Sequence, residues 1–577
     1  MSVLMNGSSE KRTPNIVLIL TDDQGWGDLS CNGNTNLSTP NIDKLAHSGA
    51  VFNNFFVQPM CAPTRAEILT GRYYPKTGVR GVTQRTECLN LDEVTIGDVF
   101  KAVGYATGCF GKWHSGSAYP YHPNGRGFDE FFGFCCGHWS HYFDSTLEHN
   151  GEEVKCKGYI ADILTEKAME FMEANRHQPF FCYVPFNTPH SPFQVPDRWF
   201  NKFKDHDITM RHRDPEKENL DITRSVLAMC ENIDWNVGRL IEKIDRLELT
   251  RDTIVVYLSD NGPNSCRWNG GMSGIKCSTD EGGVRSPCFI TWPGTIEGGQ
   301  RIEEIAGAID LLPTLADLAG IEMIKTKPLD GISLKPLLSG IRHNWKGRSI
   351  FAHSVNGKFT SIRTQRYRAG GDSGGLYDMT NDLGQYNDLS QAMPELAEEL
   401  QANISEWRER VIPKQAADND IPVGYPEFPN TYLNAQDGIP SGNIKWSSIH
   451  PNASYFIGWN DIKDCLYWEI DVHTSGYYEI TLMYACGAGD EGSEIEFEYK
   501  GSRVTAYISE AFAPPLKDDC DRVKRVESYD KEFRPLFMGT MFMQKGSGKA
   551  VLRAKTKPGF EVCEVRSVKV KLVKPEQ

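Results

Sequence analysis

Short apolar runs that alternate with helical segments constrain the fold of this chain more than any other feature of its sequence. The run from Asn15 to Leu20, bounded by Pro14 and by a polar Thr-Asp-Asp triplet, is typical of a strand buried on both faces. Further helices are expected from Thr39-Pro40 onward and over 95–102, 160–174 and 224–247, and further strands over 105–110, 180–185 and 253–258. This alternation predicts a doubly wound, mostly parallel α/β sheet flanked by helices, with ligands beyond the carboxyl ends of its strands.

The sequence changes character after this alternating region. A mixed α+β pattern ends in a helix that keeps Leu400, Ile404 and Trp407 on one apolar face. A segment rich in Pro, Asn, Asp and Gly follows, and beyond it apolar residues alternate with period two, which is typical of a β-sandwich. The expected organisation is a tail (1–13), an α/β domain (14–345), a small α+β subdomain (346–415), a linker (416–442) and an all-β sandwich domain (443–577).

The formal net charge of -14 restricts the partners of the protein. Nucleic acid and anionic membranes would be repelled by the average field, so neither is an expected partner. An anionic substrate would require positive side chains concentrated at its site. The apolar run Val3-Leu4-Met5 is too short for the core of a signal peptide, and no segment reaches membrane-spanning length, so membrane insertion is not expected.

The segment from Cys61 to Gly71 carries the most specific chemical signal. Pro63 falls in the first turn of an expected helix, so Cys61 lies at a helix N-terminus, where the dipole and free amide groups favour an anion. Arg65 follows one turn later and adds a fixed positive charge. A single cysteine before a proline is more often a packing or turn residue, so this segment needs support from elsewhere in the chain.

Two pairs of polar residues follow two of the expected strands. Asp22 and Asp23 follow the first strand, and Asp260 and Asn261 follow the strand over 253–258. Either pair alone is more often a solvated turn or a helix cap. Three carboxylates brought together at strand ends would repel one another unless a cation neutralised them. Oxygen ligands of this kind select a hard divalent cation, Ca²⁺ or Mg²⁺, over zinc.

Taken together, these segments resemble the formylglycine-dependent (type I) sulfatase family of the alkaline-phosphatase-like superfamily. Residues 61–71 match the family signature for conversion of cysteine to formylglycine, CxPxR followed by TG, without a departure. The resemblance covers roughly 14–411. It is renewed at Leu20-Thr21-Asp22-Asp23-Gln24-Gly25, Phe110-Gly111-Lys112-Trp113-His114, Gly127-Phe128-Asp129-Glu130, Asn187-Thr188-Pro189-His190, Leu258-Ser259-Asp260-Asn261-Gly262, Gly274-Ile275-Lys276 and Glu281-Gly282-Gly283.

This resemblance implies a sulfuric ester hydrolase that contains one divalent cation, with Ca²⁺ favoured over Mg²⁺, and a formylglycine made from Cys61 by a maturation enzyme. The implied metal ligands are Asp22, Asp23, Asp260, Asn261 and the modified Cys61. The implied catalytic residues are Cys61, Arg65, Lys112, His114, His190 and Lys276. In the expected mechanism, hydrated residue 61 attacks sulfur, His190 protonates the leaving alcohol, and His114 then takes a proton from the second hydroxyl. The family also implies a periplasmic or secreted location.

A sulfated polysaccharide or oligosaccharide is the expected substrate. Aromatic and hydrogen-bonding side chains near a sulfate site suit a sugar ring, although the same residues are equally consistent with surface packing. The candidate substrate contacts, in loops expected to overhang the pocket, are His138, Trp139, His141, Arg267 and Trp268. The β-sandwich suggests an accessory carbohydrate-binding or pocket-shaping module.

Two other functions stay open at this point. A phosphonate or phosphate-diester hydrolase can share the same modified nucleophile and cation site. A noncatalytic glycan-binding protein could be built on a decayed form of the same fold, but decay usually removes catalytic residues, and every expected position is present here.

Overall fold

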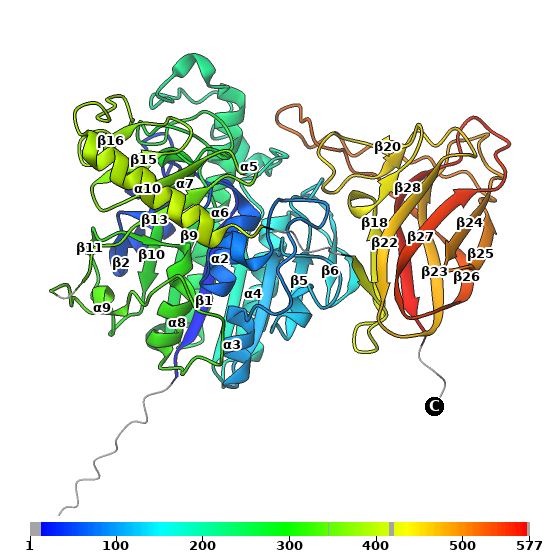
Figure 1. The fold of residues 1–577 in the computed structure, drawn as a ribbon, viewed down its shortest axis with the longest axis horizontal. Coiled ribbons are helices and arrows are strands. Elements are labelled where there is room, and N and C mark those ends of the chain that lie inside the picture. Colours follow the sequence, from blue (N-terminus) through cyan, green and yellow to red (C-terminus); the bar gives the residue numbers. More distant parts are fainter. Residues whose placement is uncertain (1–12, 344, 415–419, 574–577) are drawn as a thin grey trace, which may run out of the picture.

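The structure is a computed structural model that describes residues 13–343, 345–414 and 420–573. An α/β domain, coloured blue to yellow-green, lies beside a C-terminal β-sandwich, coloured yellow to red (Figure 1). Among the described residues, no helix combines the length and the apolar composition needed to span a bilayer.

A ten-stranded sheet forms the centre of the α/β domain, in the order β11-β2-β10-β9-β1-β8-β4-β5-β6-β7. Its strands are β1 (Asn15–Thr21), β2 (Ala50–Phe52), β4 (Ala106–Lys112), β5 (Glu130–Phe134), β6 (Thr146–His149), β7 (Glu152–Lys155), β8 (Phe180–Pro185), β9 (Thr253–Ser259), β10 (Cys288–Thr291) and β11 (Gln300–Ile302). The central strands β9, β1, β8, β4 and β5 are parallel, whereas β10, β6 and β7 join by antiparallel pairing. The predicted fold class is confirmed.

Helices cover both faces of this sheet. One face carries α1 (Pro40–Ser48), α4 (Ile160–Ala174) and α6 (Leu220–Arg246), and the other carries α2 (Cys61–Thr70), α3 (Ile96–Ala102), α8 (Leu311–Ala319) and α9 (Lys335–Leu338). Val17 and Ile19 of β1 face the first layer, while Ile16, Leu18 and Leu20 face the second, because successive side chains of a strand point to opposite sides. Apolar layers on both faces therefore explain the continuous apolar runs in the sequence.

A smaller antiparallel sheet follows the large one. It contains β13 (Ile350–His353), β14 (Thr360–Arg363), β15 (Tyr367–Gly370) and β16 (Leu376–Asp378). The helix α10 (Pro394–Val411) packs Leu400 and Ile404 against Ile362 and Leu376 of this sheet. The short helix α5 (Asp197–Phe200) packs against α6, and the short helix α7 (Glu281–Val284) is buried.

The C-terminal domain is a sandwich of two six-stranded sheets that share one apolar core. One sheet contains β17 (Ile421–Val423), β19 (Ile439–Pro440), β22 (Cys465–Val472), β24 (Glu494–Tyr499), β25 (Ser502–Tyr507) and β27 (Gly546–Ala554). The other contains β18 (Asn430–Asn434), β20 (Lys445–Trp446), β21 (Phe456–Ile457), β23 (Gly476–Ala485), β26 (Arg534–Met543) and β28 (Glu564–Leu572).

The segment expected as a linker, 416–442, belongs in large part to this sandwich. Within it, β17 and β19 pair with β22, and β18 pairs with β28. These strands are too short to show a period-two pattern, and their backbone hydrogen bonds are made to strands far away in the sequence. Residue 415, the last of the expected α+β subdomain, and residues 416–419 of the expected linker lie outside the described residues.

Candidate active site

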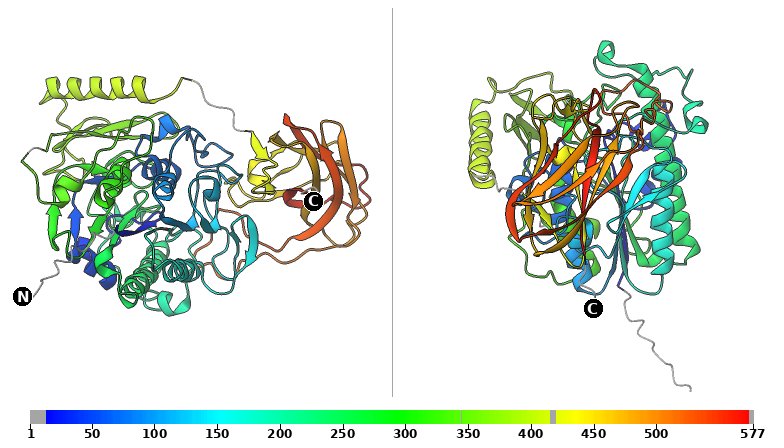
Figure 2. Two further views of the ribbon diagram at one scale, coloured as in Figure 1. Left: turned by 90° about the horizontal axis from the view of Figure 1, so that it is seen from below. Right: turned by 90° about the vertical axis from the view of Figure 1, so that its right-hand side faces the viewer.

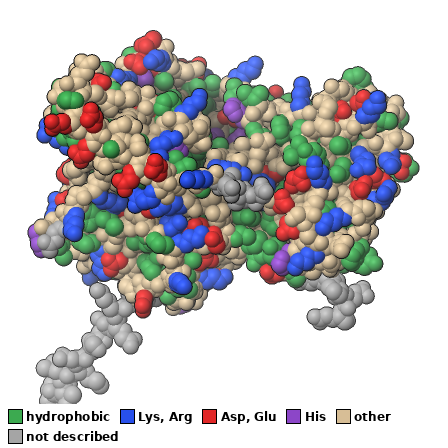
Figure 3. Space-filling model, in the orientation of Figure 1, with side chains coloured by type: hydrophobic (Ala, Val, Ile, Leu, Met, Phe, Trp, Pro, Cys, Tyr) green, Lys and Arg blue, Asp and Glu red, His purple; other side chains and the backbone are tan. Residues whose placement is uncertain are grey.

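A pocket of about 430 Å³ lies at the carboxyl ends of the central strands. We call it the strand-end pocket. The α/β domain lines it with Asp23, Met60, Cys61, Val82, His114, Gly137, His138, His190, Ser191, Phe193, Ile222, Asn264, Ser265 and Lys276, and the sandwich with His450, Asn452, Lys524, Arg525, Val526 and Glu527. In Figure 3 the surface is hollowed between the two domains, and histidine side chains are visible there.

Two neighbouring strands bring the acidic residues together. Because β1 and β9 pair in parallel with Thr21 opposite Ser259, the residues that follow both strands meet at one edge of the sheet. The backbone amide of Asp23 donates a hydrogen bond to Asp260 Oδ1 at 3.1 Å. Asn261 Nδ2 donates to Asp23 Oδ1 at 2.8 Å. The structure thus joins Asp22, Asp23, Asp260 and Asn261, all fully buried, in one cluster.

Cys61 lies against this cluster at the first residue of α2. The residue before it, Met60, has no side chain that caps the helix. The amide groups of the first helical turn therefore have no side-chain acceptor from the N-cap residue. Single ligand atoms of Cys61, Asp22 and Asp260 all lie within 4.8 Å of one another. Burial raises the pKa of the Cys61 thiol, so the unmodified side chain stays protonated.

Three cations surround the acidic cluster. Arg65 lies 2.8 Å from Asp260 Oδ2, Lys112 lies 2.8 Å from Asp22 Oδ2, and Lys276 lies 2.6 Å from Asp23 Oδ1. Burial, followed by the neighbouring charge of Asp22, raises the pKa of Asp260 to about 6. For Asp23 burial acts in the same direction, but Lys276 and His190 outweigh it and lower its pKa. The cluster is a dense network of alternating charges, in which only Lys276 is partly exposed.

The donor set of this cluster fits a hard divalent cation. Asp22 Oδ1 and Asn261 Oδ1 are buried and, among the described residues, have no hydrogen-bond partner. An unpaired buried acceptor is costly, and these two oxygens, with the carboxylates of Asp23 and Asp260, form a set of oxygen ligands of the kind that Ca²⁺ and Mg²⁺ bind. The residues present therefore fit the cation that the resemblance implies.

His114 presents one unpaired ring nitrogen at the pocket. Its Nε2 lies 2.8 Å from the carbonyl oxygen of Val82, which can only accept, so Nε2 carries the proton. Nδ1 is buried without a hydrogen-bond partner among the described residues. Burial and the charge of Lys112 lower the pKa of His114 well below its usual value. The ring is therefore neutral, with a free lone pair on Nδ1, and its φ of 60° lies in the left-handed region that a non-glycine residue rarely adopts.

His190 lines the same pocket and lies beside Asp23. Its Nδ1 lies 2.6 Å from the carbonyl oxygen of Ser191, which fixes a proton on Nδ1, and its Nε2 lies 3.5 Å from Asp23 Oδ2. Burial, followed by the charge of Lys276, lowers the pKa of His190 to about 4. An anion bound beside it would raise that pKa, because a nearby negative charge favours the protonated ring.

Only one of the candidate sugar contacts lines the strand-end pocket, and it is His138. Arg267 is buried in an ion pair with Asp28 at 2.6 Å. Trp268 lies beside Trp26, with ring centroids 6.4 Å apart. His141 and Trp139 also lie outside the lining of the pocket. The side chains of these four residues pack elsewhere and do not line the strand-end pocket. A position shortly after a strand-end motif is therefore not enough to place a residue in the pocket.

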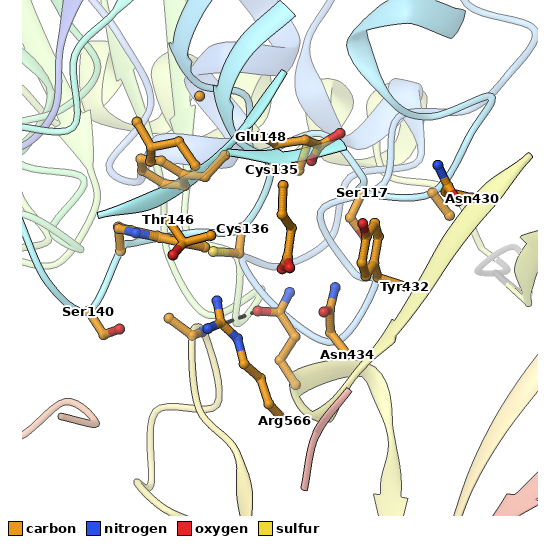
Figure 4. Close-up of a pocket in the computed structure, with 18 of the residues that line it drawn as sticks. Ser117, Cys135, Cys136, Ser140, Thr146, Glu148, Asn430, Tyr432, Asn434 and Arg566 are labelled. Carbon is orange, nitrogen blue, oxygen red and sulfur yellow. Dashed lines mark hydrogen bonds between the residues drawn. The ribbon is translucent and has the colours of Figure 1, made fainter. Parts of the chain in front are cut away.

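Trp139 lines a second cavity, of about 110 Å³, between the two domains. Figure 4 shows Cys135, Thr146 and Glu148 of the α/β domain facing Tyr432 and Arg566 of the sandwich across it.

His122, Cys135 and Glu148, at the edge of this second cavity, lie close enough to suggest metal ligands. His122 Nδ1 accepts a hydrogen bond from the amide of Asn124 at 3.2 Å, so in the neutral ring the proton is on Nε2, which faces Glu148 Oε1 at 2.6 Å. A protonated nitrogen has no lone pair for a metal, and the group is better described as a buried polar contact.

Sequence reasoning missed the pocket residues that come from the sandwich. The loop that contains Lys524–Glu527 carries a cluster of charges between Lys517 and Asp530, but an exposed loop without function would show the same pattern. Its position depends on contacts between residues more than 300 positions apart, such as the hydrogen bond from Gln194 Nε2 to Asp521 Oδ1 (|i−j| = 327).

The sequence matches known proteins over the α/β domain and the small sheet. The family model Sulfatase matches residues 14–321, and the model N-sulphoglucosamine sulphohydrolase, C-terminal, matches residues 276–410. Arylsulfatase A from Homo sapiens is 34% identical over 409 residues, covering 63% of this chain and 76% of that protein. N-acetylgalactosamine-6-sulfatase from Mus musculus is 30% identical over 393 residues, covering 62% and 71%. The structure of Ps i-CgsB in complex with k-i-k-neocarrahexaose is 31% identical with a TM-score of 0.63, covering 71% of this chain and 96% of that chain.

Proposed function

Because the chain belongs to the sulfatase family and is a sulfuric ester hydrolase, we propose that it removes sulfate from a sulfated polysaccharide or oligosaccharide at the strand-end pocket. The observation that carries the proposal is the meeting of Cys61 with Asp22 and Asp260 among three buried or half-buried cations. That arrangement provides a nucleophile position, a cation site and a positive field at one place.

Asp22, Asp23, Asp260, Asn261 and residue 61 would hold the cation. Bound there, the divalent cation supplies charge that neutralises the carboxylates and polarises a sulfate oxygen. Asp22 Oδ1 and Asn261 Oδ1 support this assignment because they are buried acceptors without a partner among the described residues. The oxygen ligands favour Ca²⁺ or Mg²⁺, and Ca²⁺ is proposed.

A formylglycine made from Cys61 by a maturation enzyme would supply a hydrated aldehyde with two hydroxyl groups, one to attack sulfur and one to permit release of sulfate by carbon–oxygen cleavage. Around that position Lys276, Lys112 and Arg65 place positive charge on the sulfate oxygens, where negative charge increases in the transition state. Full burial of Lys112 and Arg65 strengthens their effect, because little water screens them.

The two histidines are suited to different proton transfers. Nδ1 of His114 has a free lone pair and takes a proton from the second hydroxyl of residue 61. Nε2 of His190 donates a proton to the leaving alcohol oxygen. The sulfate group beside His190 raises the pKa of that ring when substrate binds, and Lys276 holds the sulfate next to it.

A glycan is proposed as the leaving group because of the similar proteins. Ps i-CgsB binds k-i-k-neocarrahexaose, and the curated relatives include an N-acetylgalactosamine-6-sulfatase. The strand-end pocket of about 430 Å³ has room for a sugar ring. Periplasmic or secreted location stays a prediction.

A sulfate-release screen over defined sulfated glycans tests this proposal. Purified protein, with formylglycine at position 61 verified by peptide mass spectrometry, is incubated with each glycan, and free sulfate is measured. Nitrophenyl sulfate and a phosphonate diester serve as comparison substrates. Faster turnover of the phosphonate diester than of every sulfate ester would contradict the proposal, and so would release of no sulfate from any glycan.

A further inference from the structure

The β-sandwich forms one side of the strand-end pocket. Two of its loops reach the pocket: 447–455, between β20 and β21, and 508–533, between β25 and β26. The second loop is the orange segment that extends from the sandwich toward the α/β domain in Figures 1 and 2. We call the pocket residues on these loops the sandwich wall: His450, Asn452, Lys524, Arg525, Val526 and Glu527.

Hydrogen bonds attach the longer loop to the α/β domain beside the candidate catalytic residues. Arg525 donates to the carbonyl oxygen of Ser140, and Ser191 Oγ donates to Glu527. Gln194 Nε2 donates to Asp521 Oδ1 at 2.7 Å. Ser191 is the residue after His190, so this loop is held against the segment that carries a candidate proton donor.

The shorter loop is attached at a second point. Asn452 Nδ2 donates to the carbonyl oxygen of Val82 at 3.2 Å, and the same oxygen accepts from His114. The two loops also contact each other, since Ser448 Oγ donates to the carbonyl oxygen of Val526 at 3.1 Å. With both loops fixed to the α/β domain and to each other, the wall is a permanent part of the pocket and not a separate domain on a flexible tether.

Lys524 is a positively charged residue of this wall that has no charged partner among the described residues. Arg525 is buried and paired with Asp521 at 2.6 Å, and Glu527 accepts from Ser191. Lys524 is exposed, and it has no ion pair or side-chain hydrogen bond with any residue that the structure describes. His450 is exposed on the same wall. In a chain of net charge -14, an unpaired lysine at the mouth of a pocket for anions is a local exception to the average field.

Resting on the proposed function, we propose that the sandwich wall is an anion subsite. In this proposal Lys524, with His450 on the same wall, binds a second anionic group, a sulfate or a carboxylate, on the sugar next to the one that carries the reacting sulfate. Residue 61 and the cations around it then recognise the reacting ester, and the sandwich wall selects glycans with anionic groups on adjacent sugars. The effect depends on salt, because Lys524 is exposed and a mobile ion atmosphere screens it.

Steady-state kinetics with matched substrates test this subsite. The substrates are a monosulfated disaccharide, the same disaccharide with a second sulfate on the neighbouring sugar, and the same disaccharide with a uronate carboxylate there. Full-length wild type, Lys524→Gln, Lys524→Arg and a control, Lys463→Gln, are compared. Lys463 is also an exposed lysine of the sandwich, and it does not line the pocket.

Lys524→Gln should raise KM about 5-fold for the doubly charged substrates, the upper end for an exposed ion pair, and should raise KM for the monosulfated substrate by a clearly smaller factor. Lys524→Arg should retain the low KM, because the charge is kept. Whichever doubly charged substrate shows the larger change identifies sulfate or carboxylate as the group bound. Equal changes on all three substrates, or no change on any, would overturn the subsite, and so would the same change in Lys463→Gln.

A binding measurement separates failure of this subsite from failure of the proposed function. In a Cys61→Ala background the same disaccharides are titrated by calorimetry, where no turnover is needed. If wild type hydrolyses none of the glycans, the proposed function fails, yet a Kd for the doubly charged ligands that rises about 5-fold with Lys524→Gln would still support the subsite. Hydrolysis by wild type with an unchanged Kd would contradict the subsite alone.

Discussion

The strand-end pocket has a floor, by which we mean residue 61 with the acidic cluster and the three cations beside it, and this floor differs from the sandwich wall in how its charges are held. On the floor, Asp22, Arg65, Lys112 and Asp260 are fully buried and pair with one another at the ends of parallel strands. On the wall, Lys524 and His450 are exposed on the loops 508–533 and 447–455. Buried charges in fixed positions stabilise one transition state strongly, whereas exposed charges on loops adjust which substrate enters. We therefore expect changes to the floor to lower turnover and changes to the wall to alter substrate preference.

The largest effect is expected at Cys61. Cys61→Ala removes the site of the modified nucleophile and should lower kcat by about 10⁴-fold or more on every sulfate ester. Sulfate release is measured, with the thermal unfolding midpoint as a control for folding. Turnover above a trace in this variant would show that hydrolysis of the sulfate ester does not need residue 61.

The next largest effect is expected at Glu281. Glu281, buried at the start of α7, pairs with Arg285, Arg363 and Arg368, which connect the α/β domain to the small sheet. Burial opposes its ionisation, but the arginines outweigh burial and lower its pKa to about 2. Glu281→Gln leaves these cations without a counter-charge and should reduce the free energy of unfolding by about 3–5 kcal/mol at pH 7. Glu297→Gln, at an exposed glutamate, serves as the matched control.

The ion pairs of Glu281 also predict that the free energy of unfolding depends on pH. Since the pKa of Glu281 is depressed from its ordinary value of 4.5 to about 2, its stabilisation is complete above pH 4.5 and is lost as pH falls toward about 2. The difference in unfolding free energy between wild type and Glu281→Gln, measured in urea, should therefore shrink across that range. A difference that stays constant from pH 7 to pH 3 would contradict this assignment.

Removal of the divalent cation should have a smaller effect on turnover than loss of residue 61. Chelation leaves the three carboxylates and the unpaired amide oxygen of Asn261 without a cation, and activity should fall by about 10²-fold or more. Added Ca²⁺ should restore activity better than added Mg²⁺. The thermal midpoint of the chelated protein should also fall, because a ligand that binds only the folded state stabilises it. Full activity after exhaustive chelation would argue against the cation site.

The smallest effect is expected at His138. His138 lines the strand-end pocket, whereas its neighbour Trp139 lines the second cavity and stacks on Phe134 with centroids 5.1 Å apart. His138→Gln should raise KM for a glycan a few-fold, by about the contribution of one hydrogen bond. Trp139→Leu should lower the thermal midpoint and leave KM unchanged. The reverse pattern would mean that the second cavity, and not the strand-end pocket, receives the sugar.

The sequence by itself determined the fold class and the floor of the site. Apolar runs predict the buried strands, and the polar residues after two of them, such as Asp22 and Asp260, predict the cluster of oxygen ligands. The cations Lys112 and Lys276 are implied by the resemblance to the sulfatase family. The tertiary structure decided the rest. Arg267 and Trp139 follow strand-end motifs, yet they pack away from the pocket, because their directions depend on partners such as Asp28 and Phe134.

The sandwich wall shows the same division between sequence and structure. Lys524 reaches the pocket only because Arg525 and Glu527 bond to Ser140 and Ser191, contacts between residues more than 300 positions apart that no local pattern encodes. The sequence likewise predicts a linker where the structure has β17, β18 and β19, because short strands gain their order from the distant strands with which they pair. Local sequence thus fixes where a strand ends, whereas long-range packing decides which side chains share the space beyond it.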